Sequence, residues 1–440
     1  MTNHYLSSTR FNGIPFSDLL QEVHLEEPLG RRALRSLLKD GSVSLEFGDR
    51  HPNQFIKALR EEPLEGQIAR FAEWERENRE PHEPKVALRI PATEHSPEIR
   101  IVKSEGSFCV YPTPQHLATV VNAADYAGKP FTLRLARGEP QLGFEVFDLS
   151  VLEHYRNDPR YYYQNDDILG TIYLAEHPPR QMPESDQVYL QAFGFAYDEK
   201  LNRVLAAWLW DLSCLSPEHQ QLWNAKRAIG EYKLHPDFYR GQVLGEWYEG
   251  ISVFGAFIEQ VKFVNEACTV MGRPALFRNV LSHEDRPREF GFLLRPTLKD
   301  YNSFVHLLDK LLSENVSFDF FRNEITRERE IVRKDGKTIV EQKGSLQVME
   351  EWLKSKYPPE AAPDIEDMME AFKNVRRQRQ KPAHAVEENR FDNDFVVQQR
   401  KLMEEVVGAM NTLCSMCLSQ SAVKAKGMKH PLEGRQVWPV

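Results

Sequence analysis

The sequence predicts an α+β fold in which a mixed region and a β-rich region precede a mostly helical C-terminal half. Between about residues 106 and 215, apolar and polar side chains alternate, which is typical of antiparallel strands. After residue 216 the apolar side chains recur at every third or fourth position, which indicates amphipathic helices. With 41% hydrophobic and 28% charged residues, the chain has the composition of a globular protein with a buried core.

The first two regions contain the predicted strands. Residues 1–105 form a mixed region, whose charged stretch 61–85 is either a linker or a solvated helix. Residues 106–215 form a β-rich, largely antiparallel domain. Its expected strands contain residues 131–135, 144–146 and 172–174, and its expected β-hairpin joins 191–197 to 204–208.

The remaining regions are predicted to be helical, apart from one hairpin. Ser216 before Pro217 is typical of a helix start, and residues 216–326 form a helical domain. In the linker 327–344, Asp335-Gly336 between two short β-prone runs favours a tight hairpin. Three amphipathic helices within 345–440 are expected to form a small bundle.

Charge and hydropathy limit the function classes. The net charge of −9 argues against a protein that coats nucleic acid or anionic membranes without specificity. No apolar run reaches the roughly 18 residues of a membrane span, and the first residues lack the pattern of a secretory signal. We therefore expect a cytoplasmic protein that makes no membrane contact. Its five cysteines are expected to be reduced, and no motif predicts a cofactor.

The most informative stretch is basic and lies near the end of a predicted helix. Residues 373–381 contain five cations and no acid, which predicts a local phosphate-attracting patch. At about 100° per residue, Arg376 and Arg379 point along the apolar stripe of the helix, whereas Arg377 lies off it and should be solvated. A cation on an apolar face requires a counter-charge, an interface or a ligand phosphate. Pro382 predicts that the helix ends near Gln380.

Beyond this bend, His384 can lie close to Arg379. A guanidinium there could bind the non-bridging oxygens of a phosphodiester, while the imidazole exchanges a proton with a ribose hydroxyl or a leaving oxygen. That reaction needs no metal. The alternative interpretation is a basic helix end with a capping histidine.

This pattern resembles the HEPN (higher eukaryotes and prokaryotes nucleotide-binding) superfamily, in which an arginine and a histidine are separated by four to six residues. Arg379 to His384 fits with four intervening residues, and Arg377 to His384 fits with six. The resemblance implies a metal-independent endoribonuclease with Arg379 and His384 as catalytic residues and Gln380 as their polar companion. The neighbouring cations would bind RNA: Lys373, Arg376, Arg377 and Lys381.

The resemblance also implies a homodimer through the C-terminal bundle, with a composite site where two bundles pair. The N-terminal part would then sense or restrain the nuclease, with a partner protein or a phage-derived molecule as its trigger. Antiphage defence or a toxin–antitoxin pair is the expected setting, by analogy alone. The rival from another class is a non-catalytic scaffold whose helical bundle mediates association.

Two other sets of residues suggest different sites. Asp211, Glu231 and Lys233 could belong to a metal-dependent nuclease, although this pattern is common by chance and Asp211 could simply cap a turn. Arg156, Arg160 and Tyr161 could form a surface that stacks bases or binds a nucleotide, although Asn157-Asp158-Pro159 is equally a turn.

A pair of cysteines has the spacing of half a zinc site. Cys414 and Cys417 have the two-residue gap of a zinc knuckle, but no second pair completes four ligands. Both cysteines also fit the apolar stripe of the last predicted helix, beside Met410 and Leu413. We therefore expect them to be core residues.

Overall fold

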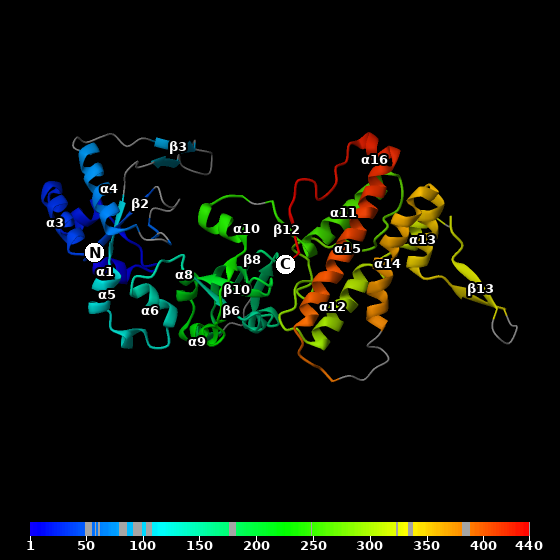
Figure 1. The fold of residues 1–440 in the computed structure, drawn as a ribbon, viewed down its shortest axis with the longest axis horizontal. Coiled ribbons are helices and arrows are strands. Elements are labelled where there is room, and N and C mark those ends of the chain that lie inside the picture. Colours follow the sequence, from blue (N-terminus) through cyan, green and yellow to red (C-terminus); the bar gives the residue numbers. More distant parts are fainter. Residues whose placement is uncertain are drawn as a thin grey trace. The chain divides into compact units, whose positions relative to one another are not determined.

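The computed structural model confirms the α+β class, with antiparallel sheets in the N-terminal half and helices in the C-terminal half (Figure 1). It describes residues 1–48, 55–57, 59, 62–78, 86–90, 99–102, 108–175, 182–247, 249–322, 324–332, 338–380 and 388–439. The chain forms two compact units. Unit 1 comprises Met1–Val151, Asn157–Tyr163 and Thr171–Trp247, and unit 2 comprises Leu152–Arg156, Gln164–Gly170 and Tyr248–Val440.

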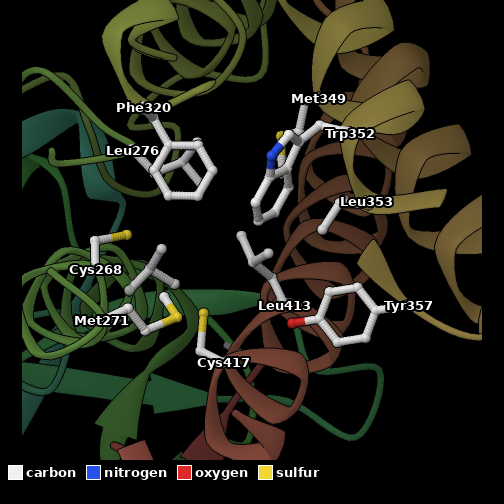
Figure 2. A pocket seen from close by; sticks show the side chains of 11 residues that line it. Cys268, Met271, Leu276, Phe320, Met349, Trp352, Leu353, Tyr357, Leu413 and Cys417 are labelled. Atoms are coloured by element: carbon white, nitrogen blue, oxygen red, sulfur yellow. The ribbon is translucent and has the colours of Figure 1, made fainter. Parts of the chain in front are cut away.

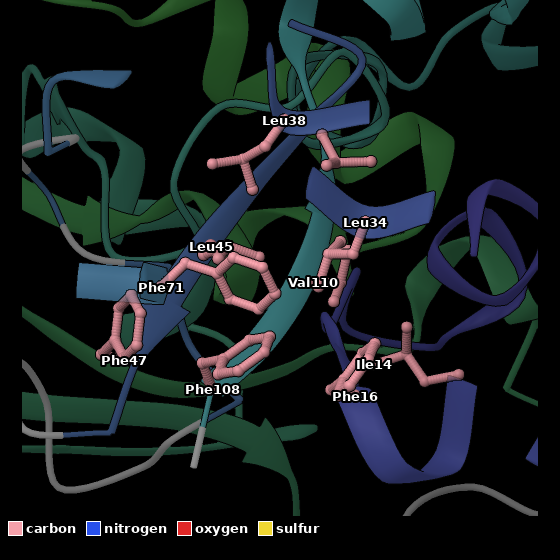
Figure 3. Close-up of a cluster of buried hydrophobic side chains, with 10 residues drawn as sticks. Ile14, Phe16, Leu34, Leu38, Leu45, Phe47, Phe71, Phe108 and Val110 are labelled. Carbon is pink, nitrogen blue, oxygen red and sulfur yellow. The ribbon is translucent and has the colours of Figure 1, made fainter. Parts of the chain in front are cut away.

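The first part of unit 1 is a small sheet covered by helices. Its strands have the order β1-β5-β2, and both pairings are antiparallel. Phe16, Phe71 and Phe108 form the aromatic centre of its core (Figure 3). The elements are α1 (Thr2–Ser7), β1 (Ile14–Pro15), α2 (Phe16–Glu22), α3 (Glu27–Lys39), β2 (Val43–Phe47), α4 (Leu64–Glu77) and β5 (Phe108–Pro112), with the separate hairpin β3 (Val86–Ile90) and β4 (Ile99–Val102).

The second part of unit 1 contains the predicted β-hairpin. Tyr197 lies opposite Arg203 and Phe193 opposite Ala207, so the two expected arms pair in antiparallel register. This hairpin is the centre of a sheet with the order β6-β10-β9-β8-β7, and one further strand, β11, pairs with β9. The strands are β6 (Phe144–Phe147), β7 (Tyr161–Asn165), β8 (Leu169–Leu174), β9 (Tyr189–Tyr197), β10 (Arg203–Trp208) and β11 (Lys233–Leu234).

One predicted strand is wrong. Residues 131–135 lie in helix α6 (Pro130–Ala136), which begins with proline at its first helical position. Phe131 and Leu135 are buried, and they are four residues apart, as one face of a helix requires. Leu133 completes an apparent period of two, so the apolar pattern alone fits both structures.

Short helices complete unit 1. The predicted start at Ser216 is confirmed, because its hydroxyl accepts a hydrogen bond from the backbone N–H of His219 at 3.3 Å, and Pro217 is the first helical residue. These elements are α5 (Pro114–Val120), η1 (Ala123–Tyr126), η3 (Glu184–Asp186), α8 (Leu209–Ser213), α9 (Pro217–Ala225), α10 (Pro236–Tyr239) and η4 (Arg240–Leu244).

Unit 2 is a helical bundle that is larger than the expected one. Helix α15 packs on α11 and α14, and α12 packs on α14 (Figure 1). Of the helices within the expected domain 216–326, α11 and α12 belong to the same unit as the C-terminal helices, whereas α9 and α10 belong to unit 1. The chain therefore divides into two units, where five regions were expected. The helices are α11 (Val253–Val270), α12 (Leu298–Leu311), α13 (Ser345–Lys356), α14 (Ala362–Gln380), α15 (Asp394–Ser419) and α16 (Ser421–Lys426).

The smaller elements of unit 2 include the predicted hairpin. Strands β13 (Glu328–Val332) and β14 (Thr338–Gln342) pair in antiparallel register, which confirms the hairpin, although Asp335-Gly336 lies outside the described residues. The others are α7 (Glu153–Arg156), β12 (Ile251–Ser252), η5 (Phe318–Phe321), η6 (Pro359–Ala361) and β15 (Val437–Trp438), while η2 (Leu149–Leu152) spans the boundary of the units.

The cysteines of the bundle are core residues, as predicted. Cys414 and Cys417 are buried, and Cys417 lines a small apolar cavity together with Cys268 and Trp352 (Figure 2). Burial raises the pKa of the Cys268 thiol to about 11 and that of Cys414 to about 12. Both thiols are therefore neutral packing groups at ordinary pH. Within the described residues, every helix is too short or too polar to span a lipid bilayer.

Candidate functional site

The last turn of α14 carries the predicted arginine. Ile365, Met368 and Phe372 bury the apolar stripe of α14, and Arg379 follows along that stripe. The Nη1 atom of Arg379 donates to Oδ2 of Asp309 on α12 at 2.5 Å. The same Nη1 atom also forms an ion pair with Oε1 of Glu314. The cation on the apolar face thus meets a counter-charge within its own chain.

Asp309 is the anchor of this arrangement. Its side chain is fully buried, and its second oxygen accepts a hydrogen bond from the hydroxyl of Ser313. The backbone carbonyl of Ser313 in turn accepts a hydrogen bond from the hydroxyl of Ser345 at 2.5 Å. Arg376 Nη1 lies 3.4 Å from the Ser313 Oγ atom. The Ser313 hydroxyl therefore links Arg376 to the buried carboxylate that binds Arg379.

The charges of this cluster reinforce one another. Hydrogen bonds to Asp309 and then to Glu314 raise the pKa of the Arg379 guanidinium above its ordinary value. The hydrogen bond from Arg379 lowers the pKa of the Glu314 carboxyl, and the nearby His306 and Lys310 add smaller effects of the same sign. Arg379 keeps 29% of its side chain exposed and Glu314 keeps 42%. The cluster is therefore open to solvent on one side and closed at Asp309.

The helical wheel correctly predicts which arginines point inward. Arg376 and Arg379 contact Ser313 and Asp309, whereas Arg377 has 52% of its side chain exposed. Its only charged contact in the described chain is with Glu370, at 2.5 Å and likewise largely exposed. The three arginines thus divide as their positions on the helix predict.

The basic patch is less positive than the sequence suggested. Lys373 pairs with Glu350 at 2.6 Å, and Arg377 and Arg379 pair with acids as described above. All four acidic partners lie outside the stretch 373–381: Asp309 and Glu314 near the end of α12, Glu350 on α13 and Glu370 earlier on α14. Counting charges within the stretch misses acids that the fold brings to it, so the described cations are largely neutralised.

Two members of the predicted site cannot be compared with Arg379. Residues 381–387, which include Lys381 and His384, lie outside the described residues. Gln380 is described and its side chain is exposed, at the last position of α14, where the helix was predicted to end. The expected pairing of the guanidinium with the imidazole of His384 remains a prediction.

The second nuclease hypothesis is not supported by the sheet register. Lys233 pairs with Tyr197, which lies opposite Arg203 at the first residue of β10. Asp211 follows the other end of β10, beyond Trp208. Five residues along a strand correspond to roughly 17 Å, so the lysine and the carboxylate lie at opposite ends of the hairpin. Among the described residues, no group of three His, Cys, Asp or Glu side chains could hold a metal ion.

Two residues of the expected ligand surface make contacts within the chain. Arg160 forms ion pairs with Asp158 at 2.7 Å and with Asp186 at 2.9 Å. Tyr161 is buried, and its hydroxyl donates to the backbone carbonyl of Asp186 at 2.9 Å. Arg156 belongs to unit 2, whereas Arg160 and Tyr161 belong to unit 1. The contacts of Arg160 with Asp158 lie within the turn at residues 157–160, which the alternative interpretation expected, whereas Asp186 binds both Arg160 and Tyr161 from outside it.

Sequence reasoning did not identify Asp309, Ser313 or Glu314. The available signal was Asp309 itself, an acid within the apolar helical run that contains Phe304 and Leu308. A carboxylate in such a position needs a partner, just as Arg379 does. Nothing in the local sequence says that the two are each other's partners, because they are far apart along the chain.

Comparisons with protein-family models, with curated proteins and with solved structures find no match to this chain. The chemistry of the junction between α12 and α14 therefore has to be inferred from its own residues. Arg379 contacts Asp309 and Glu314 through Nη1. Within the described residues, its Nε and Nη2 atoms have no hydrogen-bond partner. Those two nitrogens form the edge of a guanidinium that binds carboxylate or phosphate oxygens in pairs.

Proposed function

We propose that this chain is a metal-independent endoribonuclease in which Arg379 supplies the guanidinium and His384 the imidazole. The observation that carries the proposal is the state of Arg379: a buried carboxylate fixes one nitrogen of a guanidinium that is still partly exposed. A guanidinium held in this way can stabilise charge on a phosphate without first being ordered. It also lies five residues before His384 in the sequence.

The proposed reaction is an attack of the ribose on its own phosphodiester. The imidazole of His384 removes a proton from the 2′-hydroxyl, whose oxygen bonds to phosphorus while the bond to the 5′-oxygen breaks. The leaving oxygen takes up a proton, and the product carries a 2′,3′-cyclic phosphate. Arg379 binds the non-bridging oxygens, on which negative charge increases in the transition state.

The remaining parts of the proposal concern assembly and control. Two bundles would pair as a homodimer and place their catalytic residues in one cleft that binds RNA. Unit 1 would restrain the nuclease until a partner protein or a phage-derived molecule binds it in the cytoplasm. A nuclease that cleaves the RNA of its own cell requires such control.

A second candidate function is a non-catalytic protein whose bundle only mediates association. The observation in its favour is that Lys373, Arg377 and Arg379 already have acidic partners within the chain. Under this alternative, the ion pair between Arg379 and Asp309 merely joins α14 to α12. The two functions predict opposite results for the same substitutions.

The experiment compares Arg379→Ala, His384→Ala and Arg377→Ala in a ribonuclease assay that contains EDTA. Loss of one positioned donor to a developing charge lowers the rate by about 100- to 1,000-fold, so we expect losses of this size for the first two variants. Arg377→Ala is the comparison variant, because it removes an exposed arginine of the same helix that lies off the apolar stripe, and it should lower activity much less than Arg379→Ala.

A separate variant excludes misfolding as the cause. Arg379→Ala leaves Asp309 buried without its arginine, which also lowers stability. Arg379→Lys keeps a positive charge near Asp309 but loses the guanidinium edge, so it should stay folded and still lose most of the activity. If wild-type protein cleaves no RNA, or if Arg379→Lys and His384→Ala cleave as fast as wild type, the proposed function is wrong.

A further inference from the structure

Two carboxylates contact one nitrogen of Arg379, and they differ in almost every other respect. Asp309 is fully buried within α12, and the Ser313 hydroxyl occupies its other oxygen. Glu314 lies beyond the end of α12, and 42% of its side chain is exposed. The backbone N–H of Glu314 donates to the carbonyl of Asp309 at 3.2 Å, so the two acids are joined by a tight turn.

The physical cost of separating each pair is therefore different. An exposed ion pair contributes little free energy, because water and salt replace the partner. Breaking a buried pair is much more costly, since an uncompensated charge stays behind in the interior. Glu314 can leave Arg379 at little cost, whereas Asp309 cannot.

The guanidinium recognises carboxylate and phosphate by the same geometry, two oxygens in the plane of its nitrogens. We propose that Glu314 is a built-in competitor for Arg379: its negative charge at Nη1 opposes a phosphate on the Nε and Nη2 edge, and Glu314 moves away when a phosphate of the RNA binds there, while Asp309 stays and positions the guanidinium. This inference rests on the proposed function and names a positioning residue and a competing residue for the same site. Glu314 then determines how tightly RNA binds, and Asp309 determines the position of the Arg379 guanidinium.

The two acids should affect different kinetic constants. Glu314→Gln removes the competing charge, and the free energy of an exposed pair corresponds to a two- to fivefold lower KM for a single-stranded RNA, with kcat unchanged. The advantage should shrink as salt is added, because the competition is between exposed charges. Asp309→Asn removes the anchor, and a misplaced catalytic group lowers kcat by about 100-fold, with a smaller effect on KM.

Glu370→Gln is the matched control for the competitor. It also neutralises a largely exposed glutamate paired with an arginine of α14, but its partner Arg377 faces away from the site. Its KM and kcat should equal those of wild type within about twofold. A lower KM in both variants would mean that any loss of negative charge favours RNA, which would overturn the specific role of Glu314.

A binding measurement separates this inference from the proposed function. In a His384→Ala background, which should not cleave, fluorescence anisotropy with a short labelled single-stranded RNA should show two- to fivefold tighter binding after Glu314→Gln. If Arg379→Lys abolishes cleavage but Glu314→Gln leaves KM and this affinity unchanged or weaker, the inference is wrong and the nuclease stands. If instead Arg379→Lys and His384→Ala cleave RNA as fast as wild type, the proposed function is wrong, and this inference is wrong with it.

Discussion

Asp211 of unit 1 is buried in a different way from Asp167 and Asp309 of unit 2. In unit 2, Asp167 and Asp309 are fully buried, and each contacts an arginine: Arg286 binds Asp167 through two nitrogens at 2.7 and 2.8 Å, and Arg379 binds Asp309 at 2.5 Å. In unit 1, Asp211 is only 4% exposed, and its Oδ2 atom has no hydrogen-bond partner among the described residues. Burial raises the pKa of Asp211 to about 7. A hydrogen bond from the Trp210 side chain and the charge of Arg10 lower this pKa only in part, and within the described residues Asp211 forms no ion pair such as those of Asp167 and Asp309.

The two paired aspartates of unit 2 also differ from each other. Arg286 is almost completely buried, and its third nitrogen, Nε, donates to the carbonyl of Phe290 at 2.5 Å. Its guanidinium is fully used within the fold. Arg379 contacts the other described residues through Nη1 alone, and 29% of its side chain is exposed. A structural arginine and a candidate functional arginine can therefore be distinguished by which nitrogens the fold already occupies.

The largest effect on stability is expected at the buried ion pair between Asp167 and Arg286. Asp167→Ala leaves Arg286 buried without its counter-charge, which should lower the free energy of unfolding by about 3–5 kcal/mol. Urea denaturation followed by circular dichroism measures this difference. The control is Glu370→Ala, which breaks an exposed pair and should leave the free energy of unfolding almost unchanged. Equal losses in the two variants would contradict the distinction between buried and exposed pairs.

Much of the fold follows from local sequence. The helix start at Ser216 is visible in the sequence because its short polar side chain can cap a backbone N–H three residues later, as the structure confirms. The hairpin of β9 and β10 follows from alternation around a polar turn. Residues 131–135 were predicted to be a strand because the spacing of their apolar side chains fits a strand as well as a helix. Pro130, at the first position of the helix, was the better signal, but it is a single residue.

The candidate site was predictable only in part, for a physical reason. Helical periodicity is a local property, so the inward direction of Arg379 could be predicted from its own helix. Its partner Asp309 comes from α12, about one-sixth of the chain earlier, and that contact exists only after α12 and α14 have packed. The sequence shows that Arg379 requires a counter-charge, but it cannot show whether the fold or a ligand provides it.

A smaller and pH-dependent effect is expected at Asp211. Its pKa in the folded state, about 7, is above the ordinary 3.8, so ionised Asp211 destabilises the fold above pH 7, and this destabilisation disappears below about pH 4. The shift corresponds to at most about 4 kcal/mol, and Asn keeps a buried polar group, so Asp211→Asn should add about 2 kcal/mol at pH 8. Thermal denaturation at pH 8 and pH 4.5 tests this. A gain of the same size at both pH values would contradict the role of ionisation.

The smallest effect is expected at Cys214, which is exposed while the other cysteines, all within the described chain, are buried. Partial desolvation and then the charge of Asp211 raise the pKa of the Cys214 thiol. Asp211→Asn removes that charge, so the thiolate fraction rises and labelling by a disulfide reagent at pH 8 should be about twofold faster. At pH 6 Asp211 is mostly protonated, and the two rates should converge. A difference that persists at pH 6 would mean that the substitution acts through packing, because a protonated carboxyl no longer repels the thiolate.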